Sequence, residues 1–117
     1  AKPDAHLAAA LFQQAAALGD PRSQSNLGSM YAQGIGVQRD EAKAWLWYER
    51  SAEQGCPDGQ YNLAVFYSQG LGGCEKDLLR AQALCEQAAA QGHEKARLIV
   101  QQSRALGAPD PFSSNYF

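Results

Sequence analysis

The 117-residue sequence predicts an all-α fold: a right-handed α/α solenoid of about three helix pairs, six helices in all, with an extended C-terminal tail. Two observations lead to this prediction. The sequence repeats itself at an offset of 36 residues, which becomes 37 at the last step. Within each copy, small and large apolar residues return at helical spacing. One helix pair cannot bury its own apolar face, so the pairs must stack on one another.

The repeat is visible in short stretches of sequence. The Asn-Leu-Gly of residues 26–28 returns as Asn-Leu-Ala at residues 62–64, and Tyr31 returns as Tyr67. The extra residue at the last step falls in a loop, because residues 34–40 become the eight residues 70–77. The expected helices span residues 4–18, 21–33, 40–54, 57–69, 77–91 and 94–106, in one domain, 1–107, followed by a tail, 108–117.

Each of the first five segments carries its own signals for where a helix begins and ends. The first, third and fifth begin at an aspartate, a good N-cap residue, and stop at a glycine fifteen residues later. The second and fourth have proline in the first turn, where its missing N–H costs little, and end at Gly34 and Gly70. The sixth, 94–106, lacks the Asn-Leu-Gly and tyrosine signature, as terminal units often do. Small residues at Gly28, Ala44 and their repeats predict close helix approach, with Leu27, Tyr31, Trp47 and Tyr48 filling the space between turns.

Composition excludes several classes of function. Ten Lys and Arg against twelve Asp and Glu give a net charge of −2, so we expect no nucleic-acid partner. No apolar run is long enough to insert into a membrane. Residues 1–6 lack the pattern of a signal peptide, which leaves a cytoplasmic and an exported location equally open.

The repeated positions resemble Sel1-like repeats, which are relatives of the tetratricopeptide repeats. The resemblance covers about residues 4–106 and rests on the pattern Gln24, Asn26, Leu27, Gly28, Tyr31, Gly34, Gly36, Val37, Asp40, Lys43, Ala44, Trp47, Tyr48, Ser51, Ala52 and Gly55. It departs at the Gly72-Gly73-Cys74 loop, and Leu84-Cys85 replaces the Trp-Tyr pair. The resemblance implies a bacterial or eukaryotic adaptor without a catalytic role, often exported in bacteria.

Three cysteines and His93 are numerically enough for a zinc site, but their spacings contain no close chelate pair. In the helical arrangement Cys56 and Cys74 lie at opposite edges and Cys85 occupies a core position, so we expect free thiols and no metal. A Cys74–Cys85 disulfide requires the intervening loop to fold back. The glycine-rich residues 34–37 and 70–73 follow helices rather than strands, which favours turns over phosphate binding. No set of nucleophile, base and orienting group is present, so we expect neither an enzyme nor a cofactor.

In related solenoids the second helix of each pair lines the concave face, so the resemblance implies that a protein or peptide binds there. Asn26 and Asn62 either bond the adjacent helix or offer donor and acceptor to an extended peptide backbone. Tyr61 is either a binding anchor or a groove-wall residue packed on the next repeat. Trp45 lies outside the apolar face of its helix. It is either an exposed binding residue on the convex surface or a residue that covers a neighbouring helix. The predicted partner-binding residues are Arg22, Ser25, Asn26, Ser29, Gln33, Asp58, Tyr61, Asn62, Val65, Gln69, Lys95, Leu98 and Gln102.

The tail carries two prolines, Pro109 and Pro111, which bar helix continuation, and three aromatic residues. We expect it at the open end of the solenoid. The alternatives are disorder, truncation of a longer protein, or docking into a neighbour, which would give self-association. A non-catalytic adaptor is therefore the predicted function. The alternatives are a structural spacer or fragment of a scaffold that assembles through its ends, and, third, a hydrolase.

Overall fold

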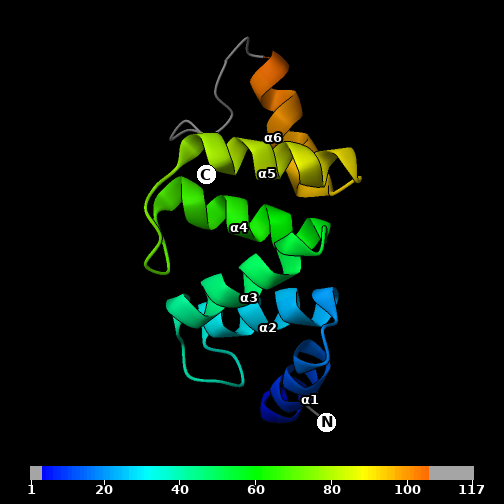
Figure 1. The fold of residues 1–117 in the computed structure, drawn as a ribbon, viewed down its shortest axis with the longest axis vertical. Helices are drawn as coiled ribbons and strands as arrows, with labels where there is room; N and C mark the ends of the chain where they lie inside the picture. The colour runs from blue at the N-terminus through cyan, green and yellow to red at the C-terminus, as the bar shows by residue number, and fades with distance from the viewer. Residues whose placement is uncertain (1–3, 106–117) are drawn as a thin grey trace.

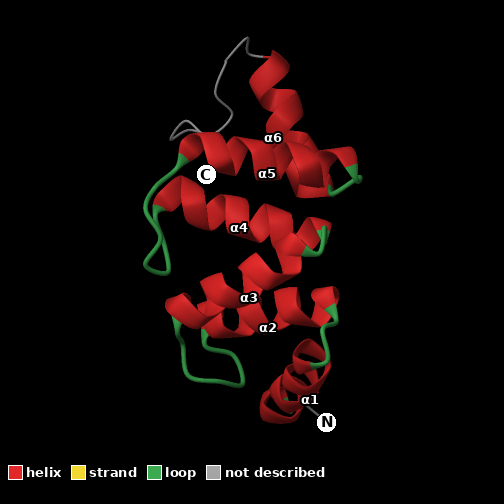
Figure 2. Cartoon of the chain, in the orientation of Figure 1, coloured by secondary structure: helices red, strands yellow, loops and turns green. Residues whose placement is uncertain are grey.

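The computed structural model describes residues 4–105 and contains six helices that follow one another in a single stack (Figure 1). No strand occurs in this part of the chain (Figure 2). The prediction of an all-α solenoid is confirmed. The helices are α1 (Ala5–Ala17), α2 (Pro21–Gln33), α3 (Glu41–Glu53), α4 (Pro57–Gln69), α5 (Leu78–Ala90) and α6 (Glu94–Ala105). We refer to α1, α3 and α5 as the B helices and to α2, α4 and α6 as the A helices.

The observed helix ends lie inside the ranges expected from the sequence, because the signals for them are local. Asp40 and Asp77 are extended N-cap residues whose carboxylates accept the backbone N–H three residues later, at 3.1 Å in both. The A helices α2 and α4 end at Gly34 and Gly70, which have φ of +70° and +68°. This left-handed conformation is the usual C-cap and favours glycine. The tail at residues 108–117 lies outside the described residues.

Helices α2 and α3 approach one another closely because Gly28 has no side chain. A Cβ added at Gly28 would lie 2.7 Å from Cε1 of the Tyr48 ring and 3.2 Å from the Ala44 carbonyl oxygen. Tyr48 is buried and packs edge-on against Phe66 of α4, with ring centroids 5.2 Å apart. One aromatic side chain therefore fills the space that three successive helices leave between them.

The B helices α3 and α5 contact the preceding A helices in the same way. The Lys43 ammonium lies 5.4 Å from the centroid of the Tyr31 ring, and the Arg80 guanidinium lies 4.9 Å from that of Tyr67. These are cation–π contacts at matching positions of the repeat. The periodic sequence thus produces periodic packing, in which each helix contacts its neighbours in chain order.

Trp45 covers a neighbouring element rather than standing free on the convex side. Its side chain is partly buried against the core, and a Cβ added at Gly72 would lie 2.8 Å from the Trp45 Cβ. The α4–α5 loop therefore lies directly over this tryptophan. The indole Nε1 is buried and makes no hydrogen bond of normal geometry within the described chain.

The last A helix is placed differently from the other two. Helices α2 and α4 contact one another directly, whereas α6 packs mainly on α5 and projects from the end of the stack (Figure 1). This difference decides which predicted residues share a surface. None of the described helices is both long enough and apolar enough to span a membrane.

Candidate interaction groove

An open groove runs across the A helices α2 and α4 and reaches the turn between α5 and α6. It has a volume of about 620 Å³, and its exposed wall is more polar than apolar. We call it the A-helix groove. It is lined by Arg22, Ser25, Asn26, Ser29, Gln33, Pro57, Asp58, Tyr61, Asn62, Gln91, Gly92, His93, Glu94 and Lys95.

Nine of the thirteen residues predicted to bind a partner line this groove. The other four, Val65, Gln69, Leu98 and Gln102, do not. Leu98 is exposed and lines a separate small depression with Glu94, Arg97 and Gln101. Of the predicted residues on α6, only Lys95 therefore lines the groove, and Val65 and Gln69 of α4 also lie outside it. Helical register predicts which side of its helix a residue faces. It does not predict the angle between α6 and the rest of the stack.

Three charged residues of alternating sign form a row across the groove. Arg22, Asp58 and Lys95 occupy the same step of three successive repeats, because their offsets are 36 and 37 residues. Arg22 and Lys95 are exposed, and neither makes an ion pair within the described part of the chain. The groove therefore offers two unpaired cations, and the exposed Glu94 carboxylate is its other charge without an ion pair in the described residues.

His93 connects Asp58, the central residue of that row, to the first turn of α6. Its Nε2 lies 3.1 Å from the Asp58 carboxylate, and its Nδ1 accepts the Ala96 backbone N–H at 3.3 Å. The neutral ring with its proton on Nε2 satisfies both contacts at once. The imidazole also stacks on Tyr61, with ring centroids 4.7 Å apart and planes 18° from parallel. His93 is thus both the N-cap of α6 and part of the groove wall.

The two asparagines that the sequence singles out differ in the structure. Asn62 donates a hydrogen bond to Ser25 Oγ at 3.3 Å and so ties α4 to α2. Asn26 is exposed and makes no side-chain hydrogen bond within residues 4–105. The structural role holds for Asn62, whereas Asn26 leaves its amide available in the groove.

Tyr61 lies in the groove wall and packs on the next repeat through His93. Burial raises the pKa of its hydroxyl above the ordinary tyrosine value, and the nearby Cys85 thiol adds to the rise. The phenol therefore stays neutral at physiological pH and can donate a hydrogen bond. Half-buried, rigid and amphipathic, it retains the properties of a binding anchor.

Five groove residues were not predicted: Pro57, Gln91, Gly92, His93 and Glu94. Three of them form the α5–α6 turn, and Glu94 is the first residue of α6. A signal for one was present, because His93 stands at the repeat position of Asp20 and Cys56, immediately before an A helix. Asp20 is the N-cap of α2 and accepts the Ser23 N–H. Histidine is not among the usual N-cap residues, so this position did not stand out.

The three cysteines are free thiols in the structure, and no group of three His, Cys, Asp or Glu side chains in residues 4–105 is arranged to hold a metal. Cys74 donates to the Leu71 carbonyl at 3.0 Å, and burial raises its pKa. Cys85 is fully buried, and burial followed by the charge of Glu86 raises its pKa to about 11. Both thiols therefore stay protonated at neutral pH, in the form that is a poor nucleophile.

The Sel1 repeat model matches residues 1–20, 21–56 and 57–93, which is most of the chain. The chain belongs to the Sel1 repeat family. Members of this family are generally protein-interaction modules and typically non-catalytic scaffolds. No curated protein sequence matches the chain.

Two solved structures are similar to this one. The crystal structure of a Sel1 repeat protein from Oxalobacter formigenes shares 45% identity at a TM-score of 0.72, over 78% of this chain and 68% of that one. A protective antigen of uropathogenic Escherichia coli strains that displays an SLR fold shares 35% identity at a TM-score of 0.73. That match covers 86% of this chain but only 22% of the antigen, so the present chain corresponds to about a fifth of it.

Proposed function

We propose that this chain is a non-catalytic adaptor that binds an extended segment of a protein or peptide in the A-helix groove. The observation that carries the proposal is that nine side chains chosen from repeat register alone line a single groove. A rigid stack of helices presents these groups without having to order them on binding, which lowers the cost of association.

The charge and hydrogen-bonding pattern of the groove favours a partner segment with an acidic side chain. Asp58 is engaged by His93, whereas Arg22 and Lys95 carry their charge without an ion pair in the described chain. The amide of Asn26 adds a donor and an acceptor for the partner's backbone. An extended acidic segment satisfies all three groups.

The proposal is tested by affinity capture followed by titration calorimetry with the captured partner. The double variant Arg22→Ala/Asn26→Ala removes two exposed side chains that make no hydrogen bond or ion pair in residues 4–105. We expect it to stay fully helical and to weaken binding about ten-fold or more, since contact residues of this kind contribute on the order of 1 kcal/mol each.

The matched control is Glu75→Ala/Lys76→Ala, a pair of exposed residues in the α4–α5 loop outside the groove. It should bind like the unmodified chain. Equal affinity of the groove variant and the control for the same partner would exclude the A-helix groove as the binding surface.

A further inference from the structure

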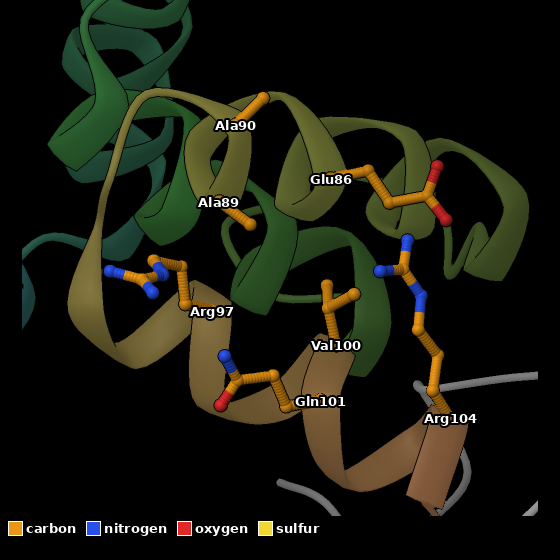
Figure 3. A pocket seen from close by; sticks show the side chains of 7 residues that line it. All are labelled: Glu86, Ala89, Ala90, Arg97, Val100, Gln101 and Arg104. Atoms are coloured by element: carbon orange, nitrogen blue, oxygen red, sulfur yellow. The ribbon is translucent and has the colours of Figure 1, made fainter.

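The open end of the stack carries a second depression, formed by the outer faces of α5 and α6 (Figure 3). It has a volume of about 260 Å³ and shares no residue with the A-helix groove. We call it the end groove. Its floor is apolar, while Glu86 and Arg104 point toward one another at one end and Arg97 lies at the other. It is lined by Glu86, Ala89, Ala90, Arg97, Val100, Gln101 and Arg104.

Repeat register shows what the end groove corresponds to elsewhere in the molecule. Its four residues from α6 stand 37 positions after Gln60, Leu63, Ala64 and Tyr67 of α4. In α4 this set contacts α5: the Gln91 amide donates to Gln60 Oε1 at 2.9 Å, and Arg80 covers the Tyr67 ring. The end groove is therefore the surface on which another B helix would pack.

Two residues exclude the ordinary packing of such a helix after α6. Gln101 stands at the position of Gly28 and Ala64, so a long side chain replaces the glycine or alanine against which a B helix packs in the two earlier repeats. Pro109 stands at the position of Gly36 and Gly72, which have φ of +75° and +69°. Proline is fixed near a φ of −65°, so the chain cannot repeat that loop. The end groove fits something thinner than a helix.

We propose that the end groove binds residues 108–117 of the same chain, with Phe112 on the apolar floor of Ala89, Ala90 and Val100. The segment begins three residues after Ala105, the last residue of α6, and Arg104 of that helix already lines the groove. Phe112 is seven residues beyond Ala105, a reach of about 23–25 Å at full extension. Arg97 and Arg104 are about 10 Å apart along the helix. The chain is therefore long enough to turn back along α6.

Composition matches the segment to the groove. The segment carries three aromatic residues, and its single charged side chain is Asp110. The groove has two arginines against one glutamate and an apolar floor. Because the two are joined by a few residues, the local concentration of the segment is of millimolar order, so a weak contact suffices. This interaction is separate from the adaptor function proposed above.

The direct test is nuclear magnetic resonance of the full chain. We expect nuclear Overhauser contacts between the aromatic protons of Phe112 and the methyl groups of Val100 and Ala89. Mixing isotope-labelled with unlabelled chain distinguishes the occupant. Contacts within one molecule support the proposal, whereas contacts that appear only between molecules and grow with concentration overturn it in favour of a second copy.

A pair of matched variants tests whether the end groove is what the segment recognises. Ala90→Arg fills the groove from an exposed position of α5, and Ala83→Arg makes the same change at an exposed position of α5 outside it. We expect Ala90→Arg to abolish the contacts and to speed amide exchange in α6 roughly ten-fold, the scale of one buried aromatic side chain. Ala83→Arg should leave both unchanged. Contacts that are absent in the unmodified chain, or that survive Ala90→Arg, overturn the proposal.

Discussion

Residue 28 shows how a single missing side chain sets the spacing of two helices. Gly28 faces the buried Tyr48 ring, and in the next repeat the two positions hold Ala64 and Cys85. In the first of these repeats the large Tyr48 side chain faces a glycine. In the next repeat the smaller Cys85 side chain faces an alanine. The loss of the tyrosine at position 85, which weakens the sequence signature, is thus compensated in volume at position 64.

We expect Gly28→Ala to lower the free energy of unfolding by about 1–2 kcal/mol. Overpacking costs about 1–3 kcal/mol, and alanine returns up to about 1 through its helix propensity. Urea denaturation measures the change. In a Tyr48→Leu background the ring is gone, so the same substitution should cost little. An equal cost in both backgrounds would show that the ring does not limit the approach.

The Cys85 thiol makes the free energy of unfolding depend on pH in the alkaline range. Its thiol is buried, and its pKa of about 11 in the folded protein compares with an ordinary value of 9.0. A raised pKa means that the neutral form is favoured on folding. The stabilisation is complete below pH 9 and is lost as the pH rises from 9 to 11.

We therefore expect the free energy of unfolding to fall by about 1–3 kcal/mol more in the unmodified chain than in Cys85→Ala over that interval, at about 1.4 kcal/mol per pKa unit. Urea denaturation at a series of pH values gives both curves. Buried tyrosines such as Tyr67 contribute the slope common to both. Parallel curves would show that the Cys85 thiol ionises normally.

Among the helices, α6 depends on a single histidine for its first turn. The Nδ1 of His93 accepts the Ala96 N–H, and Nε2 holds Asp58 of α4. In His93→Ala both contacts are lost. His93→Asn keeps a side-chain oxygen for the cap and loses the stacked ring on Tyr61.

His93→Ala should destabilise the chain by about 1 kcal/mol more than His93→Asn does, since that is the usual contribution of an N-cap. The difference should appear as faster amide exchange at Ala96 and Arg97. Exchange that is equally fast in both variants would mean that the cap contributes nothing and that the link to α4 holds the turn.

The ends of the helices were predictable because they depend on local chemistry. An aspartate followed by a helical pattern, or a glycine that must take a positive φ, marks a boundary without reference to the rest of the fold. Cap roles for Cys56 and His93 were not predictable in this way. Cys56 makes no side-chain cap hydrogen bond, and the cap at His93 uses a residue type that seldom serves there.

At the scale of the whole molecule, periodicity predicted the stack and most of the groove lining. It did not predict that the α5–α6 turn lines the groove or that α6 departs from the stack, because the angle between helices depends on the side chains that meet at the contact. Ser51 shows the same limit. It is fully buried and donates to the Pro21 carbonyl at 2.7 Å, although polarity alone would have placed it at the surface. Partner binding by the groove residues stays a prediction.

The double engagement of His93 has a consequence for how the molecule responds to a ligand. The same imidazole starts the last helix and walls the A-helix groove. A ligand that holds His93 against Tyr61 must therefore slow the fraying of α6, and unfolding of α6 must remove part of the ligand's site. Occupancy of the groove and order at the far end of the stack are thermodynamically linked, each favouring the other by the same free energy.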